Sequence, residues 1–95
     1  MVKITLAAVA ALVTAATANN CTPGFMYCGS SLLKKGAYDN QIRQALRESG
    51  QPTDGNHIVN SVFNCQGGPN GDIRYLYICD GHCIDGGDGK DDYCS

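Results

Sequence analysis

The sequence predicts an α+β fold, a small disulfide-rich domain with one helix packed on a three- to four-stranded antiparallel sheet in the order β-α-β-β. Three observations predict it. Six cysteines follow an apolar leader, one stretch has the periodicity of an amphipathic helix, and two β-rich runs flank a segment rich in Gly, Pro and Asn. The length supports a single domain, residues 19–95.

Residues 1–18 have the three-part layout of a secretory signal peptide. Lys3 precedes an apolar run from Ile4 to Ala16, and Ala16-Thr17-Ala18 then supplies small residues for cleavage. The run is too short to cross a membrane, which takes ~20 apolar residues. We therefore expect a secreted, extracellular mature chain, residues 19–95, with no integral membrane segment.

All six cysteines follow the expected cleavage point: Cys21, Cys28, Cys65, Cys79, Cys83 and Cys94. An even number in a short exported chain predicts a disulfide framework, here three bridges whose pairing the sequence leaves open. A bridge between Cys79 and Cys83 would be tight, so we expect each of them to pair elsewhere. Such a short chain buries only roughly 60% of its unfolded surface. Each bridge adds ~2–4 kcal/mol, so three bridges can match the contribution of the core.

The first expected elements are a short strand and a helical turn. Phe25–Cys28 follows the Pro23-Gly24 turn signal and predicts a strand. Ser30 or Ser31 would cap a helical turn through the two leucines that follow, and Gly36 would interrupt it.

The main helix is expected from Ala37 to Ser49. Its apolar residues share one helical face: Tyr38, Ile42, Ala45 and Leu46. Asp39 favours the positive N-terminal end of the helix. Gly50 suits the position after the last turn, and Pro52 prevents continuation.

Two β-rich runs, His57–Cys65 and Ile73–Cys79, predict an antiparallel hairpin around a Gly- and Asn-rich turn. The second run is apolar on both faces, with Tyr75 and Tyr77 on the same face, so we expect it at the centre of the sheet. The first run has at most one clearly apolar face and is expected nearer an edge. A short final strand is expected at Asp91–Cys94.

The closing stretch, Cys79 to Cys94, holds three cysteines, one histidine, five aspartates and four glycines. Its segment Gly86–Asp91 fits the GGxGxD pattern of calcium-binding repeats, and the candidate ligands are Asp85, Asp88, Asp91 and Asp92. Such repeats bind calcium between successive copies, and this chain has one. We therefore expect no metal and an acidic loop kept in water, with weak calcium binding as the alternative.

Two other kinds of site are disfavoured. Zinc on Cys79, His82 and Cys83 would need reduced thiolates, which secretion removes. His57 or His82 could serve a hydrolase as a base oriented by Asp85 or Asp88. No nucleophile lies in a recognisable turn, however. We expect no enzyme, no catalytic residue and no cofactor.

Charge narrows the choice of partner. Without Lys3 the mature chain has six Lys/Arg against nine Asp/Glu, a net charge of −3, and no basic patch, which argues against nucleic-acid binding. The candidate binding surface combines a basic pair on the helix with two strand aromatics: Arg43, Arg47, Tyr75 and Tyr77. We expect a monomer whose partner is an unknown host or microbial macromolecule.

The combination of "CTPGFMYCGSSLLKKGAYDNQIRQAL", "VFNC", "IRYLYICDGHC" and a terminal "DYC" resembles small secreted cysteine-rich proteins, candidate effectors, of filamentous ascomycete fungi. The most specific part is "YCGxxLLxxGxYxxQI", Tyr27 to Ile42. The resemblance implies a fungal source, action on a host or on microbes, and no catalytic residue. The fold plan is also similar to some fungal killer toxins. The rival functions are thus an antimicrobial or killer-type toxin and a small extracellular hydrolase.

Overall fold

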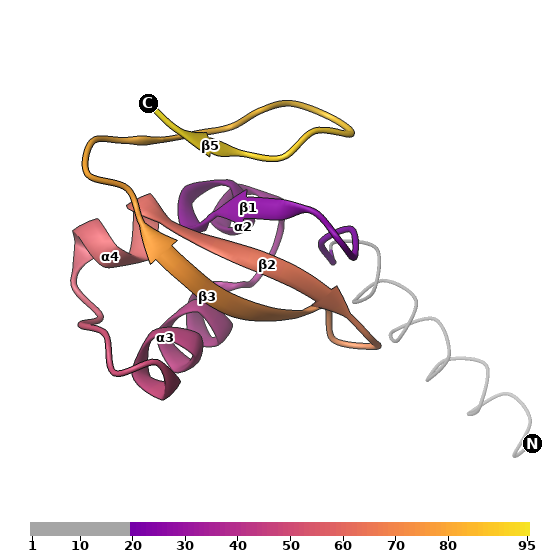
Figure 1. Ribbon diagram of the computed structural model, residues 1–95. Helices are drawn as coiled ribbons and strands as arrows, with labels where there is room; N and C mark the ends of the chain where they lie inside the picture. Colours follow the sequence, from indigo (N-terminus) through magenta and orange to yellow (C-terminus); the bar gives the residue numbers. More distant parts are fainter. Residues whose placement is uncertain (1–19) are drawn as a thin grey trace, which may run out of the picture.

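The computed structural model describes residues 20–95, and the expected signal peptide, residues 1–18, lies outside them. Within residues 20–95 the chain forms three helices, a three-stranded antiparallel sheet and a separate two-stranded sheet (Figure 1). The elements are β1 (Met26–Cys28), α2 (Gly29–Lys35), α3 (Asp39–Glu48), α4 (Gly55–Asn60), β2 (Ser61–Gly67), β3 (Asp72–Ile78), β4 (Cys83–Ile84) and β5 (Tyr93–Cys94). The α+β class and the three disulfides are confirmed, and the expectation of a single helix is wrong.

The predicted main helix is α3, two residues shorter at its start and one at its end than expected. Gly50 follows it with φ 70°. The Gly50 N–H donates to the Arg47 carbonyl (3.0 Å) and the Gln51 N–H to the Leu46 carbonyl (2.8 Å), which satisfies two carbonyls of the last turn. The expected turn before Gly36 is a helix of 7 residues, α2, which ends at Gly36 as predicted.

The first half of the expected strand His57–Cys65 is helical instead. Asp54 precedes α4 and its side chain accepts the His57 N–H at 2.8 Å, so it caps the helix. Ile58 is buried against the other helices. A local cap and one tertiary contact therefore override the β-rich composition, and the strand begins only at Ser61.

The sheet has the order β1-β2-β3, so the expected positions of the two long strands are exchanged. β2 is central because both its faces are covered, with Val62 and Phe63 each 0% exposed on opposite faces. β3 lies at the edge. Phe63 pairs with Tyr75 and Val62 with Tyr77, so β3 carries one extra residue, a β-bulge at Leu76.

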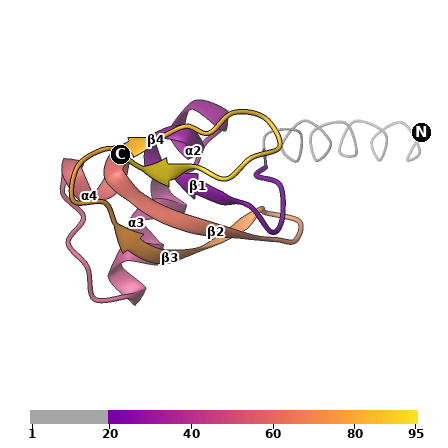
Figure 2. The same cartoon turned by 45° about the horizontal axis from the view of Figure 1, so that its top comes forward.

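The two faces of the sheet bury different clusters. The helix-side cluster holds Cys21, Leu32, Tyr38, Ile42, Ala45, Leu46, Ile58, Phe63 and Cys65. The C-terminal cluster holds Cys28, Val62, Cys79 and Cys83. The β4–β5 pair lies beside β1 (Figures 1 and 2), and its Cys83 and Cys94 belong to or pack against this second cluster. The expected final strand is thus present as β5, shortened to two residues.

The disulfides are Cys21–Cys65, Cys28–Cys83 and Cys79–Cys94. Cys79 and Cys83 each pair elsewhere, as predicted. The first bridge lies within the helix-side cluster, the second joins β1 to β4, and the third joins the end of β3 to β5. Both cores are therefore crosslinked.

Candidate functional site

A groove of about 550 Å³ runs beside α3 and is called the α3 groove here. Its lining is Asn20, Ala37, Tyr38, Gln41, Gln44, Pro69, Asn70 and Asp72. A second hollow of about 310 Å³ continues it past Ala45, Glu48 and Ile73 and shares Gln41, Gln44 and Asp72 with it. One wall is a single flank of α3, since Gln41, Gln44 and Glu48 follow helical spacing, and Ala37 and Tyr38 extend it just before the helix. The other wall is the turn between β2 and β3 and the start of β3.

Tyr38 fixes one end of the α3 groove. Its hydroxyl donates to the Gly71 carbonyl (2.8 Å) and accepts the Cys21 N–H (3.0 Å). Burial raises the pKa of Tyr38, so the group is a neutral hydrogen-bonding phenol. Gly71 has φ 61°, and a Cβ there would collide with the Tyr38 hydroxyl and with Asn20. The close approach of turn and helix therefore requires this glycine.

The α3 groove presents mainly oxygen acceptors. The Asn20 amide donates to the Pro69 carbonyl at 3.0 Å, and the Gln41 amide reaches the Asn70 and Gly71 carbonyls at 3.3 Å. No hydrogen bond within residues 20–95 uses the amide oxygen of either side chain, so both oxygens remain free to accept one. Among residues 20–95 the ion pairs are Arg43–Asp39 and His57–Asp54. Neither Asp72 nor Glu48 has a cationic partner within that part of the chain.

The four residues of the candidate binding surface are not gathered at this groove. Arg43 pairs with Asp39 at 3.1 Å, and Arg47 is exposed one turn further on. Tyr75 is half-buried and packs edge-on against Phe63, with ring centroids 6.0 Å apart. Tyr77 lies beyond the bulge and is 46% exposed. Periodicity placed the two tyrosines on one face, and the extra residue at Leu76 alters that register.

A second cleft of about 330 Å³ lies between α2 and the closing loop. Its lining includes Phe25, Tyr27, Ser31, Lys34, Lys35 and Lys90, together with Asp85, Asp88 and Asp92. The Lys35 ammonium lies 5.8 Å from the centre of the Tyr27 ring, within cation–π range. This cleft has charges of both signs.

The acidic loop is held to the domain through two of its aspartates. Asp92 is 5% exposed, and its carboxylate accepts the Cys28 and Gly86 N–H groups, each at 2.8 Å. Asp91 accepts the Met26 N–H at 2.9 Å. The expectation of a loop kept in water is wrong for Asp92, because backbone donors replace water around its carboxylate. Asp85 accepts the Gly87 N–H, and Asp88 is exposed.

The calcium and zinc sites considered from the sequence can be compared with where the structure places their candidate ligands. No group of three or more His, Cys, Asp or Glu residues comes together as a metal-binding set in residues 20–95. Cys79 and Cys83, proposed with His82 as zinc ligands, are both in disulfides.

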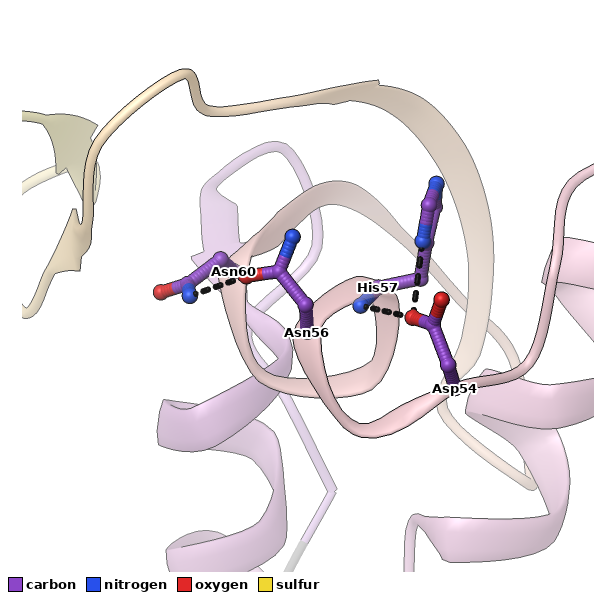
Figure 3. A network of polar contacts seen from close by, with 4 residues as sticks. All are labelled: Asp54, Asn56, His57 and Asn60. Carbon is purple, nitrogen blue, oxygen red and sulfur yellow. Dashed lines mark hydrogen bonds and ion pairs between the residues drawn. The ribbon is translucent and has the colours of Figure 1, made fainter.

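A histidine–aspartate pair does exist, but with a partner that sequence reasoning missed. The His57 Nδ1 lies 2.8 Å from the Asp54 Oδ1, the same oxygen that caps α4 (Figure 3). The His57 backbone N–H, more than its ring, holds the pKa of Asp54 below its usual range. The three-residue spacing of a helix cap was the available signal. Within residues 20–95 no hydroxyl is hydrogen-bonded to the ring.

Comparison with known proteins found no family model, no curated protein and no solved structure that matches this chain. In the part of the chain that the structure describes, no helix has the length and apolar character needed to cross a bilayer.

Proposed function

We propose that this chain is a secreted, cysteine-rich, effector-like protein that acts by binding a host or microbial macromolecule in the extracellular space or apoplast. The observation that best supports this proposal is the α3 groove. It has a volume of about 550 Å³, and some of its polar atoms have unused hydrogen-bonding capacity. Three disulfides in so small a domain are typical of extracellular proteins and support the proposed location.

The rigidity of the groove favours binding. The Cys21–Cys65 bridge joins Cys21 to β2, and the Tyr38 hydroxyl joins Cys21 to the turn at Gly71. A surface that is already ordered loses less conformational entropy when a partner docks. The scaffold therefore supports specific recognition without a large apolar interface.

The test is saturable binding of labelled, oxidised protein to intact cells and wall fractions of a host plant and of competing microbes. We expect unlabelled oxidised protein to compete, and reduced and alkylated protein to lose both binding and competition. Absence of saturable binding to every such surface would contradict the proposal. Growth inhibition by the pure protein would favour the killer-toxin alternative, although a mature net charge of −3 opposes the membrane-disrupting form of it.

The hydrolase alternative has one observation in its favour, the His57–Asp54 pair, since a carboxylate that orients a histidine is a feature of many catalytic bases. It is tested by screening polysaccharide and ester substrates with His57→Ala and with His82→Ala. Turnover that either substitution abolishes would replace binding with catalysis as the function.

A further inference from the structure

The three-stranded sheet has two outer edges, and the chain itself covers the β1 edge. The Met26 N–H donates to the Asp91 carboxylate (2.9 Å) and the Cys28 N–H to the Asp92 carboxylate (2.8 Å). The Met26 carbonyl accepts the Asp92 N–H at 3.0 Å. The outward backbone groups of β1 are therefore used.

The β3 edge is open at its first residues. Cys65 exchanges hydrogen bonds with the β1 side, since its N–H donates to the Phe25 carbonyl and its carbonyl accepts the Gly24 N–H, each at 2.9 Å. In an antiparallel sheet successive residues point their backbone groups to opposite sides, so Asn64 faces β3. Its partner Arg74 then faces β2.

By the same alternation, the neighbours of Arg74, which are Ile73 and Tyr75, direct their N–H and C=O groups away from the sheet. Among residues 20–95 no hydrogen bond from outside the sheet reaches either residue. β3 forms the outer margin of the sheet in Figures 1 and 2.

The open edge meets the α3 groove at Asp72 and the hollow that continues the groove at Ile73, and these two residues begin β3. We propose that an extended, basic peptide segment of a partner adds to β3 as a further strand and lies against the flank of α3. This inference rests on the proposed binding function and names its partner class. Strand addition of this kind obtains affinity from backbone hydrogen bonds and specificity from alternate side chains.

The dimensions fit a short segment. From Gln41 to Glu48, the residues of α3 that line the groove and its continuation, the helix rises about 10 Å, at ~1.5 Å per residue. That length accommodates about three extended residues at ~3.3 Å each. The bulge at Leu76 interrupts the regular ladder, so the added strand pairs with the Asp72–Tyr75 half of β3.

Charge selects a basic segment. The α3 groove and the hollow that continues it offer the Asp72 and Glu48 carboxylates and the amide oxygens of Asn20 and Gln41, and no Lys or Arg of residues 20–95 lines either of them. A Lys or Arg side chain on every second residue of the segment would reach these oxygens. A second copy of β3 would instead bring Arg74 and an equal number of acidic groups, so it is the less complementary occupant.

The probe is a ten-residue peptide in which lysine alternates with threonine, blocked at both ends and fluorescently labelled. Its matched partner has glutamate in place of lysine. Two further versions of the lysine peptide are N-methylated on the backbone, one at every lysine and the other at every threonine. Because an added strand donates only every second N–H, one N-methylated version loses binding and the other keeps it.

Fluorescence anisotropy with the oxidised chain measures the affinity of each peptide. We expect the lysine peptide to bind and the glutamate peptide to bind at least tenfold more weakly. Asp72→Asn and Glu48→Gln should each weaken binding about fivefold, the range of one exposed ion pair. Asp80→Asn is the control, because Asp80 is an exposed acid that lines none of the three hollows described above, and it should leave affinity unchanged.

Amide hydrogen exchange locates the peptide, since the Ile73 and Tyr75 amides should slow on binding while those of Met26 and Cys28 do not change. The proposal is overturned if the lysine peptide does not bind, if both N-methylated versions bind alike, or if a dimer of the chain alone already protects Ile73 and Tyr75. Any of these results with surface binding intact would remove this inference and leave the proposed function standing.

Discussion

The β1 and β3 edges belong to one sheet, but the described chain covers the outward backbone groups of β1 and leaves those of β3 without partners. At β1 two aspartates from the closing segment satisfy the outward N–H groups, and one of them, Asp92, is buried to do so. At β3 the outward groups of Ile73 and Tyr75 receive no such partner from the described chain. An uncovered edge is a template for another strand, so β3 rather than β1 is the edge at which the proposed peptide would pair.

Two disulfides account for the difference between the covered β1 edge and the open β3 edge. Cys28–Cys83 joins β1 itself to β4, and Cys79–Cys94 brings the last residues back to the end of β3. The β4–β5 pair has only two residues in each strand, which is too few to hold the segment by pairing alone. Crosslinks therefore decide which edge is covered.

The largest expected effect follows from removing the Cys28–Cys83 bridge with Cys28→Ala and Cys83→Ala together. The bridge spans 55 residues, and the chain-entropy estimate for a loop of that size is about 4 kcal/mol. Urea unfolding should show this loss, and the backbone amides at positions 26 and 28 should exchange faster.

The control for that experiment is the pair Cys79→Ala and Cys94→Ala. Its bridge spans 15 residues, for which the same estimate is about 3 kcal/mol. A larger loss in the control than in the Cys28–Cys83 variant would show that strain or residual structure, rather than loop closure, determines the stability of the β1 cover.

The next effect concerns the buried carboxylate. Asp92→Ala leaves the Cys28 and Gly86 N–H groups without their acceptor in a buried position, and we expect a loss of about 2–3 kcal/mol in the free energy of unfolding. Asp88→Ala, in the same loop but exposed, should change it by less than about 0.5 kcal/mol. Equal effects of the two substitutions would mean that Asp92 acts only through its charge.

The sequence predicted those elements whose signal is local. The apolar spacing of α3, its ending at Gly50 and the hairpin of β2 and β3 are all readable within a few residues. The helix α4 was missed because its residues favour strands and only the Asp54 cap marks it. The exchanged order of β2 and β3 has a different cause, since Val62 is covered by Cys28 and Cys83, which lie far away in sequence.

The same distinction explains the candidate site. Gln41 and Gln44 are visibly polar residues on α3, but the facing wall comes from residues 69–72, and only the fold brings the two together. Asp91 and Asp92 were noted as acids, and their role depends on the backbone of β1, which sequence spacing does not place beside them. Local periodicity therefore predicted the elements and could not predict their long-range partners.

A smaller loss of stability is expected from a substitution near the start of β3. Tyr38→Phe removes the hydroxyl that joins Cys21 to Gly71, and we expect a loss of about 1–1.5 kcal/mol because two backbone groups lose a buried partner. Tyr77→Phe is the exposed control and should be neutral. Hydrogen exchange at Cys21 should quicken while Met26 and Cys28 keep their protection. Simultaneous loosening of both edges would show that the two sides of the sheet are not independent.

The smallest effect is a pH dependence at Asp54, which caps the helix that leads into the shared central strand β2. Hydrogen bonds from His57 lower the pKa of Asp54 below 3.8, its ordinary value. Because the pKa is lower in the folded than in the unfolded chain, ionised Asp54 stabilises the fold above the ordinary value, and this contribution is lost as the pH falls through the lower, folded value.

Asp54→Asn keeps a capping oxygen but cannot ionise, so its thermal midpoint should fall less than that of the parent chain between about pH 5 and pH 2. The parent-minus-variant difference isolates Asp54 from the other acids, which titrate in both proteins. Since β2 borders both β1 and β3, amides at both edges should lose protection together as the pH falls. An unchanged pH dependence in the variant, or a response confined to one edge of the sheet, would show that Asp54 is not the source of the acid sensitivity.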